Sequence, residues 1–224
     1  MKTEVLAMEI EYGYTPQELE GAITGLIEKY KITQEISPYR LYFTALTDNE
    51  YAEKENAEDT KEKALTLVKE LGAAKLFGMG LLYYTGNGAQ SVEQDRKKAV
   101  AYFAVAAEHG HVEAMFNTAF CFMNGDGLAQ NRKEALYWFI KAAQNGNDRS
   151  IYFLADFHMA GYGVIETNAA EAAKYYGTSA NMGHPASFYN LGALLYNGIG
   201  IAKDEYAGLK LIEKAAELGF TPNQ

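Results

Sequence analysis

The chain has little cysteine, no long apolar run and little positive charge, and each shortage excludes a class of protein. Its only cysteine, Cys121, cannot form an internal disulfide and lies in an apolar stretch, so we expect a small core residue there and not a nucleophile. No apolar run reaches the roughly 18 residues that a membrane-spanning helix needs. Residues 1–4 are followed by a mixed segment and not by the apolar core of a signal peptide. These absences predict a cytoplasmic protein with no membrane contact.

Positive charge is scarce enough to argue against nucleic acid as a partner. The 224 residues carry 29 acidic and 20 basic side chains, a formal charge of -9 at pH 7. Nucleic acid is held largely by lysine and arginine contacts to phosphate, so an acidic chain is a poor binder of DNA or RNA. The acidity is concentrated in residues 1–70, which hold 15 acidic and 8 basic residues, a net charge of -7. The beginning of the chain therefore differs in kind from the rest.

Signatures of catalysis or cofactor binding are also missing. The stretch that contains Gly86 and Gly88 resembles a phosphate-binding loop, but no Walker-type lysine follows it. No set of nucleophile, base and orienting residue stands out. His109, His111 and His158 are the candidates for a metal site, yet His111 follows a repeated glycine and is better explained as a turn residue. We expect no enzyme activity, no metal and no cofactor.

The Gly-x-Gly motif occurs four times, and its spacing defines a repeat. The copies are 39, 36 and 37 residues apart and begin at Gly86, Gly125, Gly161 and Gly198. Self-similarity at this period is typical of a solenoid, in which one helical hairpin buries its apolar face only by stacking on its neighbours. The motif is therefore interpreted as a turn in a helical repeat and not as an isolated ligand loop.

A helix is predicted after each Gly-x-Gly motif. Large residues recur seven and eight positions after a polar residue, and small residues eleven and twelve positions after it, which places them on one helical stripe. The polar residue is a suitable N-cap, because its side chain accepts hydrogen bonds from the first helical turn. A glycine fifteen positions after the cap ends the helix. The predicted caps and end glycines are Asp95 with Gly110, Asn131 with Gly146, Asn168 with Gly183, and Asp204 with Gly219.

Between each end glycine and the next Gly-x-Gly motif lies another predicted helix, and the two helices together resemble a known repeat. Residues 189–200 and 133–146 carry the pattern most clearly, with aromatic, small and glycine residues in the order of the Sel-one-like repeat (SLR). The chain resembles this family, a relative of the tetratricopeptide class, over about residues 73–219. The resemblance implies a right-handed superhelix of helical hairpins that serves as a scaffold for protein–protein contacts.

We therefore predict a mainly α fold, an α-solenoid of four helix-turn-helix repeats preceded by a small N-terminal module. Residues 1–48 are predicted to form that module and residues 49–72 an acidic helical connector. Within a repeat region of residues 73–224, the predicted repeats are 73–110, 111–146, 147–183 and 184–219. We name the first helix of each repeat helix A and the second helix B.

The N-terminal module has a mixed strand and helix pattern. Residues 5–12 alternate apolar and polar side chains, as a strand does, and residues 31–36 and 38–46 are further strand candidates. Residues 15–18 form a strong helix start, with a threonine cap, a proline at the first helical position and a glutamate that completes a capping box. We expect that helix to continue to about residue 30, which gives a strand-helix-strand module.

A second stripe on helix A is the predicted partner-binding surface. Counted back from each Gly-x-Gly motif, positions minus nine, minus five and minus two share one face. We expect the aromatic residues at position minus nine to be buried between repeats. Positions minus five and minus two are expected to be exposed, where tyrosine and methionine suit an apolar peptide or helix. The predicted partner-binding residues are Leu81, Tyr84, Phe120, Met123, Asp156, Met159 and Tyr196.

Two functions fit these patterns. The first is a non-enzymatic protein–protein interaction scaffold or adaptor that binds a partner peptide or helix on the inner face of the solenoid. The alternative is an acidic inhibitor or mimic whose N-terminal module blocks a basic site on a partner protein. The sequence also allows a homo-oligomer, formed through the N-terminal module or through the last repeat. In that repeat Leu209 and Leu218 are expected to be partly exposed, because no further helix A covers them.

Overall fold

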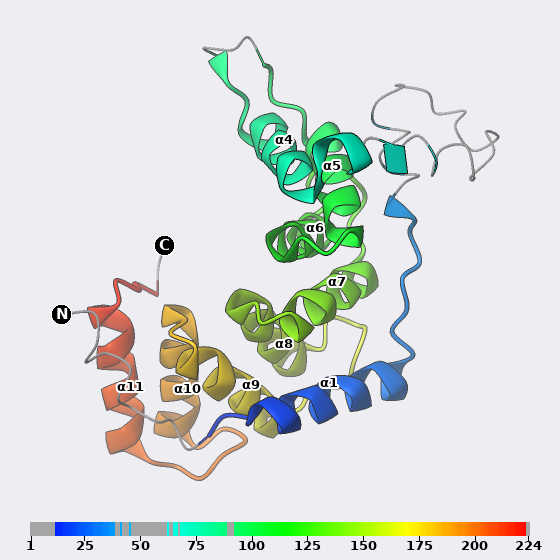
Figure 1. Ribbon diagram of the computed structural model, residues 1–224. Helices are drawn as coiled ribbons and strands as arrows, with labels where there is room; N and C mark the ends of the chain where they lie inside the picture. Colours follow the sequence, from blue (N-terminus) through cyan, green and yellow to red (C-terminus); the bar gives the residue numbers. More distant parts are fainter. Residues whose placement is uncertain are drawn as a thin grey trace. The chain divides into compact units, whose positions relative to one another are not determined.

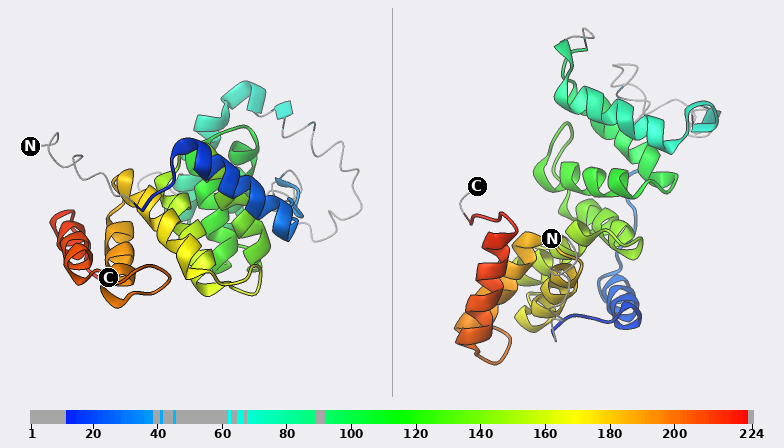
Figure 2. Two further views of the ribbon diagram at one scale, coloured as in Figure 1. Left: turned by 90° about the horizontal axis from the view of Figure 1, so that it is seen from below. Right: turned by 60° about the vertical axis from the view of Figure 1, so that its left-hand side comes forward.

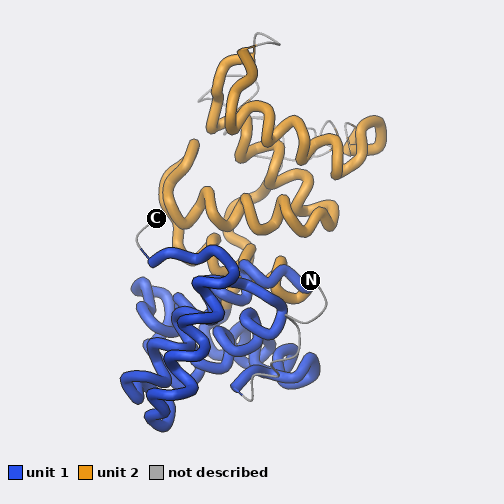
Figure 3. Tube along the Cα trace, turned by 90° about the vertical axis from the view of Figure 1, so that its left-hand side faces the viewer, with its two compact units in different colours: residues 1–31, 146–224 blue, residues 32–145 orange. Residues whose placement is uncertain are grey.

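The computed structural model describes residues 12–38, 41, 45, 62, 65–66, 68–88 and 92–222. The chain divides into two compact units, which Figure 3 shows in different colours. Unit 1 consists of residues 1–31 and 146–224, and unit 2 consists of residues 32–145. The division groups the beginning of the chain with the last two repeats and leaves the first two repeats in the other unit.

Unit 2 contains two helical hairpins that stack on each other. Helix α4 (Ala73–Thr85) pairs with α5 (Arg96–Glu108), and α6 (Val112–Asn124) pairs with α7 (Arg132–Gln144). Helix α5 also packs against α6, so the second helix of one repeat contacts the first helix of the next (Figure 1). Helices α4 and α6 are therefore the A helices of the first two repeats, and α5 and α7 are their B helices.

Unit 1 repeats this arrangement and adds one helix, α1 (Pro16–Tyr30). Helix α8 (Asp148–Ala160) pairs with α9 (Ala169–Asn181), α10 (Pro185–Asn197) pairs with α11 (Glu205–Glu217), and α9 packs against α10. Both views in Figure 2 show α10 and α11 side by side. The fold is mainly α, and the predicted α-solenoid of four helix-turn-helix repeats is confirmed.

The polar residues predicted as caps begin the B helices. Each N-cap side chain accepts a hydrogen bond from a backbone N–H of the first turn, and the caps of α5, α7, α9 and α11 are Asp95, Asn131, Asn168 and Asp204. The end glycines also have the predicted role. Gly110 follows α5 with a φ of 85° and donates its N–H to the carbonyl of Ala107 at 3.0 Å. A left-handed glycine thus closes the helix and turns the chain toward the next repeat.

The Gly-x-Gly motif has two structural roles. Its first glycine ends helix A, as predicted, since Gly86 and Gly125 are the C-caps of α4 and α6. In the second and fourth copies the second glycine, Gly127 or Gly200, also allows close packing, whereas nothing lies within 4 Å of a Cβ atom on Gly88 or Gly163. A Cβ atom on Gly127 would lie 2.2 Å from the carbonyl oxygen of Arg96 at the start of α5. The turn of the second repeat therefore contacts the B helix of the first.

Small residues allow the two helices of a hairpin to approach each other closely. A Cβ atom on Gly80 would lie 2.5 Å from the ring of Phe103 on the paired helix. Cys121 on α6 belongs to the same core cluster as Phe103 and is only 1% exposed, and burial raises the pKa of its thiol to about 12. A thiol that stays protonated is a poor nucleophile. The prediction of a core cysteine is confirmed.

The predicted helix start in the N-terminal module is confirmed. Thr15 caps α1, and its hydroxyl accepts the backbone N–H of Glu18 at 3.3 Å. The carboxylate of Glu18 accepts the backbone N–H of Thr15 at 2.9 Å, which completes the capping box. The helix ends at Tyr30, where it was expected to end. The strand predicted for residues 5–12 lies outside the described residues except for its last position, which is in a turn.

The strand predicted for residues 31–36 is wrong. The backbone N–H groups of Glu35 and Ile36 donate to the buried carboxylate of Glu134, so they do not pair with a neighbouring strand. Strand propensity depends strongly on such tertiary partners. The strand predicted for residues 38–46 is also wrong at its described positions, which are helical: Pro38, Leu41 and Ala45.

The connector predicted for residues 49–72 is described mainly at its end. Residues 68–71 are helical, and Gly72, with a φ of 77°, precedes α4. The predicted domain boundary at residue 48 lies outside the described residues and stays a prediction.

The B helix of the last repeat has one face that is more open than in the other repeats. Leu209 on α11 is 49% exposed, whereas the equivalent residues Val100, Leu136 and Ala173 are at most 2% exposed. Leu218 is half-buried. The partial exposure expected for this repeat is confirmed, and self-association through it stays a prediction.

Candidate functional site

Three of the predicted partner-binding residues meet in unit 2. Leu81 and Tyr84 come from α4, and Phe120 comes from α6. They line an apolar hollow of about 250 Å³, which we name the α4–α6 hollow; its other walls are Phe103, Phe116, Asn117 and Cys121. Positions minus five and minus two of one A helix thus lie next to position minus five of the following A helix.

Tyr84 is held in place by a charged pair. Its hydroxyl donates to Asp126 Oδ2 at 3.0 Å, and the guanidinium of Arg96 lies over its ring, 4.1 Å from the centroid. Arg96 also pairs with Asp126, with 3.0 Å between Nη1 and Oδ2. Burial and the bond to the carboxylate raise the pKa of the Tyr84 phenol, so it is a neutral donor at pH 7. The tyrosine wall of the hollow is therefore fixed without a partner.

Asn117 is the polar residue of the hollow, and the partner-binding stripe did not include it. It lies on α6 and is half-buried, and its side chain forms no hydrogen bond with the described residues. An amide offers both a donor and an acceptor, the same groups that a peptide backbone presents. A signal in the sequence could have identified it, because Asn190 occupies the same position of helix A in the last repeat.

Met123 and Leu81 differ in their relation to the hollow. Met123 is half-buried on α6 and does not line it. Its backbone carbonyl accepts the side-chain amide of Gln130 at 2.7 Å. Leu81 lines the hollow and is 40% exposed. Of the predicted residues in unit 2, Leu81 is thus the one most accessible to a partner.

In unit 1 the predicted residue Asp156 belongs to an internal network. The hydroxyl of Tyr176 on α9 donates to Asp156 Oδ1 at 2.5 Å, and Tyr152 on α8 also faces the carboxyl group. Burial raises the pKa of Asp156 to about 6, although the two tyrosines act in the opposite direction. The amide of Asn190 bonds to the Tyr152 hydroxyl at 3.4 Å. The carboxylate is engaged with its own chain.

Met159 and Tyr196 are the remaining predicted residues. Met159 is half-buried on α8, and Tyr196 is 38% exposed on α10. Tyr196 packs closely on the last B helix, since a Cβ atom on Gly208 would lie 2.9 Å from the Tyr196 Cβ atom. Neither residue lines the α4–α6 hollow. The structure therefore brings together three of the seven predicted residues.

The aromatic residues at position minus nine are partly or fully buried, and three of them make a ring contact with the residue that follows an end glycine. Phe77 stacks on His111 with 4.4 Å between ring centroids, and Tyr152 meets His184 at 4.9 Å. In the last repeat the partner of Tyr189 is Phe220, at 5.3 Å. Phe116 is 7% exposed. Packing against the following repeat thus explains Phe77 and Tyr152.

The same contacts explain the histidines. His111 is the N-cap of α6, where its Nδ1 accepts the N–H of Ala114 at 3.2 Å, and His184 is the N-cap of α10. The prediction that His111 is a turn residue is confirmed. In the described part of the chain, no three side chains of His, Cys, Asp or Glu are grouped as a metal site requires. No helix among the described residues is long and apolar enough to cross a membrane.

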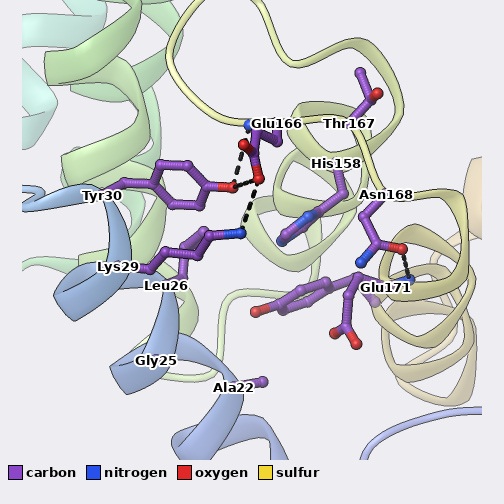
Figure 4. A pocket seen from close by; sticks show the side chains of 11 residues that line it. Ala22, Gly25, Leu26, Lys29, Tyr30, His158, Glu166, Thr167, Asn168 and Glu171 are labelled. Carbon is purple, nitrogen blue, oxygen red and sulfur yellow. Dashed lines mark hydrogen bonds and ion pairs between the residues drawn. The ribbon is translucent and has the colours of Figure 1, made fainter.

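His158 lines a separate hollow of about 220 Å³ in unit 1, between α1, α8 and the start of α9 (Figure 4). It is 8% exposed and stacks on Tyr175, with 5.2 Å between ring centroids. Burial lowers the pKa of the imidazole, which is therefore neutral at pH 7. On the α1 side, Lys29 and Tyr30 both bond to the carboxylate of Glu166. We interpret His158 as a packed core residue.

Family comparison identifies the repeat. The model of the Sel1 repeat matches residues 76–111, 112–147, 148–184 and 186–220. The chain therefore belongs to the Sel1 repeat family, and the SLR resemblance is confirmed. Proteins with Sel1 repeats generally serve as non-catalytic scaffolds for protein–protein interactions. No curated protein matches the chain.

Two solved structures have a similar fold. One is a Sel1 repeat protein from Oxalobacter formigenes, with 25% sequence identity and a TM-score of 0.63 over 92% of this chain and 85% of that one. The other is a protective antigen of uropathogenic Escherichia coli with an SLR fold, with 23% identity and a TM-score of 0.62. The match covers 92% of this chain but only 42% of the antigen.

Proposed function

We propose that the chain is a protein–protein interaction scaffold whose α4–α6 hollow binds one large apolar side chain of a partner peptide. The observation that supports this is the convergence of Leu81, Tyr84 and Phe120 on an apolar hollow of about 250 Å³. Full burial of a leucine or phenylalanine side chain contributes about 1.5–3 kcal/mol. The amide of Asn117 lies at the same place and has the groups that a peptide backbone needs.

The wall formed by Tyr84 favours binding for a second reason. Its contacts with Arg96 and Asp126 fix the ring before a partner arrives. Binding to an ordered side chain loses less conformational entropy than binding to a mobile one. The Arg96–Asp126 pair stays at the edge of the site, where it contributes to position more than to affinity.

The acidic inhibitor or mimic is the second candidate and stays a prediction. Most of the acidic connector lies outside the described residues, and Glu35 of the N-terminal module pairs with Lys133 of the same chain at 2.5 Å. The two candidates differ in their response to salt. Contacts between exposed charges weaken steeply as ionic strength rises, whereas binding in an apolar hollow does not.

A short peptide tests the hollow directly. The probe is an acetylated, amidated pentapeptide with a central phenylalanine between alanines, titrated into the full-length protein and followed by NMR of the backbone amides. Weak binding is expected, with a Kd on the order of 1 mM for one anchored side chain. The shifts are expected to centre on Leu81, Asn117 and Phe120. A peptide with glutamate in the central position is expected to bind at least tenfold more weakly.

Two variants make the assignment specific. Phe120→Ser is expected to weaken binding about tenfold, because it removes the apolar wall. Met123→Ser is the matched control on the same helix, outside the hollow, and is expected to change the affinity less than about twofold. Equal losses from both variants, or equal binding of the glutamate peptide, would refute the proposed site.

A further inference from the structure

The segment before α1 crosses α9 in direct backbone contact. Gly177 lies in the middle of α9, and a Cβ atom on it would lie 2.5 Å from the carbonyl oxygen of Tyr12. Gly13 faces the same helix, since a Cβ atom there would lie 3.0 Å from the backbone nitrogen of Thr178. Figure 1 shows this segment passing beside α9. The crossing requires glycine on both sides.

Tyr14 fixes the position of the crossing. Its backbone N–H donates to Thr178 Oγ1 at 2.7 Å, and its hydroxyl donates to the carboxylate of Glu171. Its ring and that of Tyr175 form a T-shaped contact with 5.1 Å between centroids, and Lys174 Nζ lies 5.5 Å from the Tyr14 ring centroid. We name residues 12–30 the arm. The arm site consists of Glu171, Lys174, Tyr175, Gly177 and Thr178 on α9.

The arm site is particular to the third repeat. A glycine inside a helix is less stable than alanine by about 1 kcal/mol, so its presence in α9 needs a reason. The equivalent residues of the other B helices are Ala104, Ile140 and Glu213. Only the helix that the arm crosses has glycine at this position. The close approach of the arm therefore explains Gly177.

The arm is held by few apolar side chains. Ile23 and Leu26 are the buried residues of α1, at 1% and 5% exposure. The ion pair between Lys29 and Glu166, at 3.0 Å, is exposed at both ends and contributes little. Opening of the arm breaks these contacts and those of Tyr14 but leaves the hairpins intact. Such a local opening requires less free energy than unfolding of the unit.

The chain that connects the arm to its site is long. It leaves unit 1 after Lys31, forms all of unit 2, and re-enters unit 1 at Gly146. The hydrogen bond between Tyr14 and Thr178 thus joins residues 164 positions apart. A second copy of the chain presents an identical arm to an identical site. Exchange of the arm between copies preserves every contact of the crossing.

We propose that the arm site is an interface for a second copy of the chain, in which each copy places residues 12–30 on α9 of the other. The dimer presents two α4–α6 hollows. A partner with two apolar segments then binds both, and the second contact forms at a high effective concentration. This consequence for the partner rests on the proposed function, whereas the exchange of arms does not.

Two full-length variants that complement each other test the exchange. Gly177→Val fills the arm site on α9 and leaves the arm unchanged. The double variant Gly13→Val with Tyr14→Ala removes the contacts of the arm and leaves the arm site unchanged. Light scattering is expected to show a dimer of the wild type that grows with concentration and a monomer for each variant alone. An equimolar mixture of the variants is expected to give a 1:1 heterodimer in native mass spectrometry, because one intact arm meets one intact site.

Gly25→Val is the matched control, since it also changes a glycine inside a helix, but nothing lies within 4 Å of a Cβ atom there. It is expected to dimerise as the wild type does. If Gly177→Val does not fold, the double variant Gly13→Val with Tyr14→Ala is compared with the wild type at equal concentration, and only the wild type is expected to dimerise. Monomers in the mixture and in the concentrated wild type would overturn the proposal. These measurements contain no peptide, so they are independent of the pentapeptide titration.

Discussion

Position minus five of helix A borders an apolar hollow in unit 2, whereas in unit 1 it belongs to a buried hydrogen-bond network. Leu81 on α4 and Asp156 on α8 both occupy position minus five of helix A. Leu81 borders the α4–α6 hollow, whereas Asp156 accepts a hydrogen bond from Tyr176 at 2.5 Å. Helix A thus borders an apolar hollow at Leu81, whereas at Asp156 it bonds to its own helix B.

The residues around Leu81 and Asp156 also differ between the two units in their hydrogen bonding. Phe103 and Tyr176 are equivalent residues of helix B, and only the tyrosine has a hydroxyl to donate to a carboxylate. Asn117 has no hydrogen bond from its side chain to the described residues, whereas its equivalent Asn190 bonds to Tyr152 at 3.4 Å. The repeat frame is therefore common to both units, and the polar groups on its A helices distinguish them.

The largest effect is expected from the pH dependence of the network. Burial raises the pKa of Asp156 to about 6 from an ordinary value of 3.8. Because the folded value is the higher one, the stability that this group contributes is fully present below about pH 4 and is lost as the pH rises through about 6. The loss amounts to at most about 3 kcal/mol.

The variant Asp156→Asn isolates this effect, because an amide resembles the protonated carboxyl group and does not titrate. Urea denaturation of both proteins is expected to give similar free energies of unfolding near pH 4 and a gap near pH 7 in favour of the variant. A gap that is the same at both pH values would show that Asp156 has an ordinary pKa. The contrast between a buried carboxyl group in unit 1 and an accessible hollow in unit 2 would then be lost.

A smaller effect is expected from truncating the two equivalent residues at pH 5, where the Asp156 carboxyl is mainly protonated. Asp156→Ala leaves the buried hydroxyl of Tyr176 without its partner, which costs about 2 kcal/mol. Leu81→Ala removes a side chain that is 40% exposed and is expected to cost less than about 1 kcal/mol. Urea denaturation monitored by circular dichroism measures the free energy of unfolding of each variant. Equal decreases for the two variants would contradict the distinction between the two units.

Much of the fold follows from local sequence signals. Asp95 and Asn131 could be predicted as N-caps because each side-chain oxygen accepts an N–H group that lies only two or three residues later in the sequence. The end glycines act in the same local way. The role of Gly127 could not be predicted, because its neighbour, the Arg96 carbonyl, comes from the preceding repeat. The strand predicted for residues 31–36 was wrong for a similar reason: its N–H groups donate to Glu134, which is distant in the sequence.

The candidate site was predictable only in part. Helical spacing placed Leu81 and Tyr84 on one face, and the repeat register added Phe120. The same rule included Asp156, because spacing does not show that a tyrosine of helix B lies within hydrogen-bonding distance. Gly177 gave a visible signal, because the equivalent residues of the other B helices are Ala104, Ile140 and Glu213, but its meaning requires the position of the arm.

The smallest effect tests whether the wall of the hollow is fixed by its polar contact. Tyr84→Phe removes the hydroxyl that donates to Asp126 at 3.0 Å and keeps the ring. It is expected to lower the free energy of unfolding by about 1 kcal/mol and to change the affinity for the phenylalanine pentapeptide less than about threefold, since the apolar surface remains. Tyr196→Phe is the control at the equivalent position of the last repeat, where the residue is 38% exposed and a change below about 0.5 kcal/mol is expected. A tenfold loss of affinity from Tyr84→Phe alone would mean that the hydroxyl itself contacts the peptide, and the hollow of unit 2 would then be a polar site.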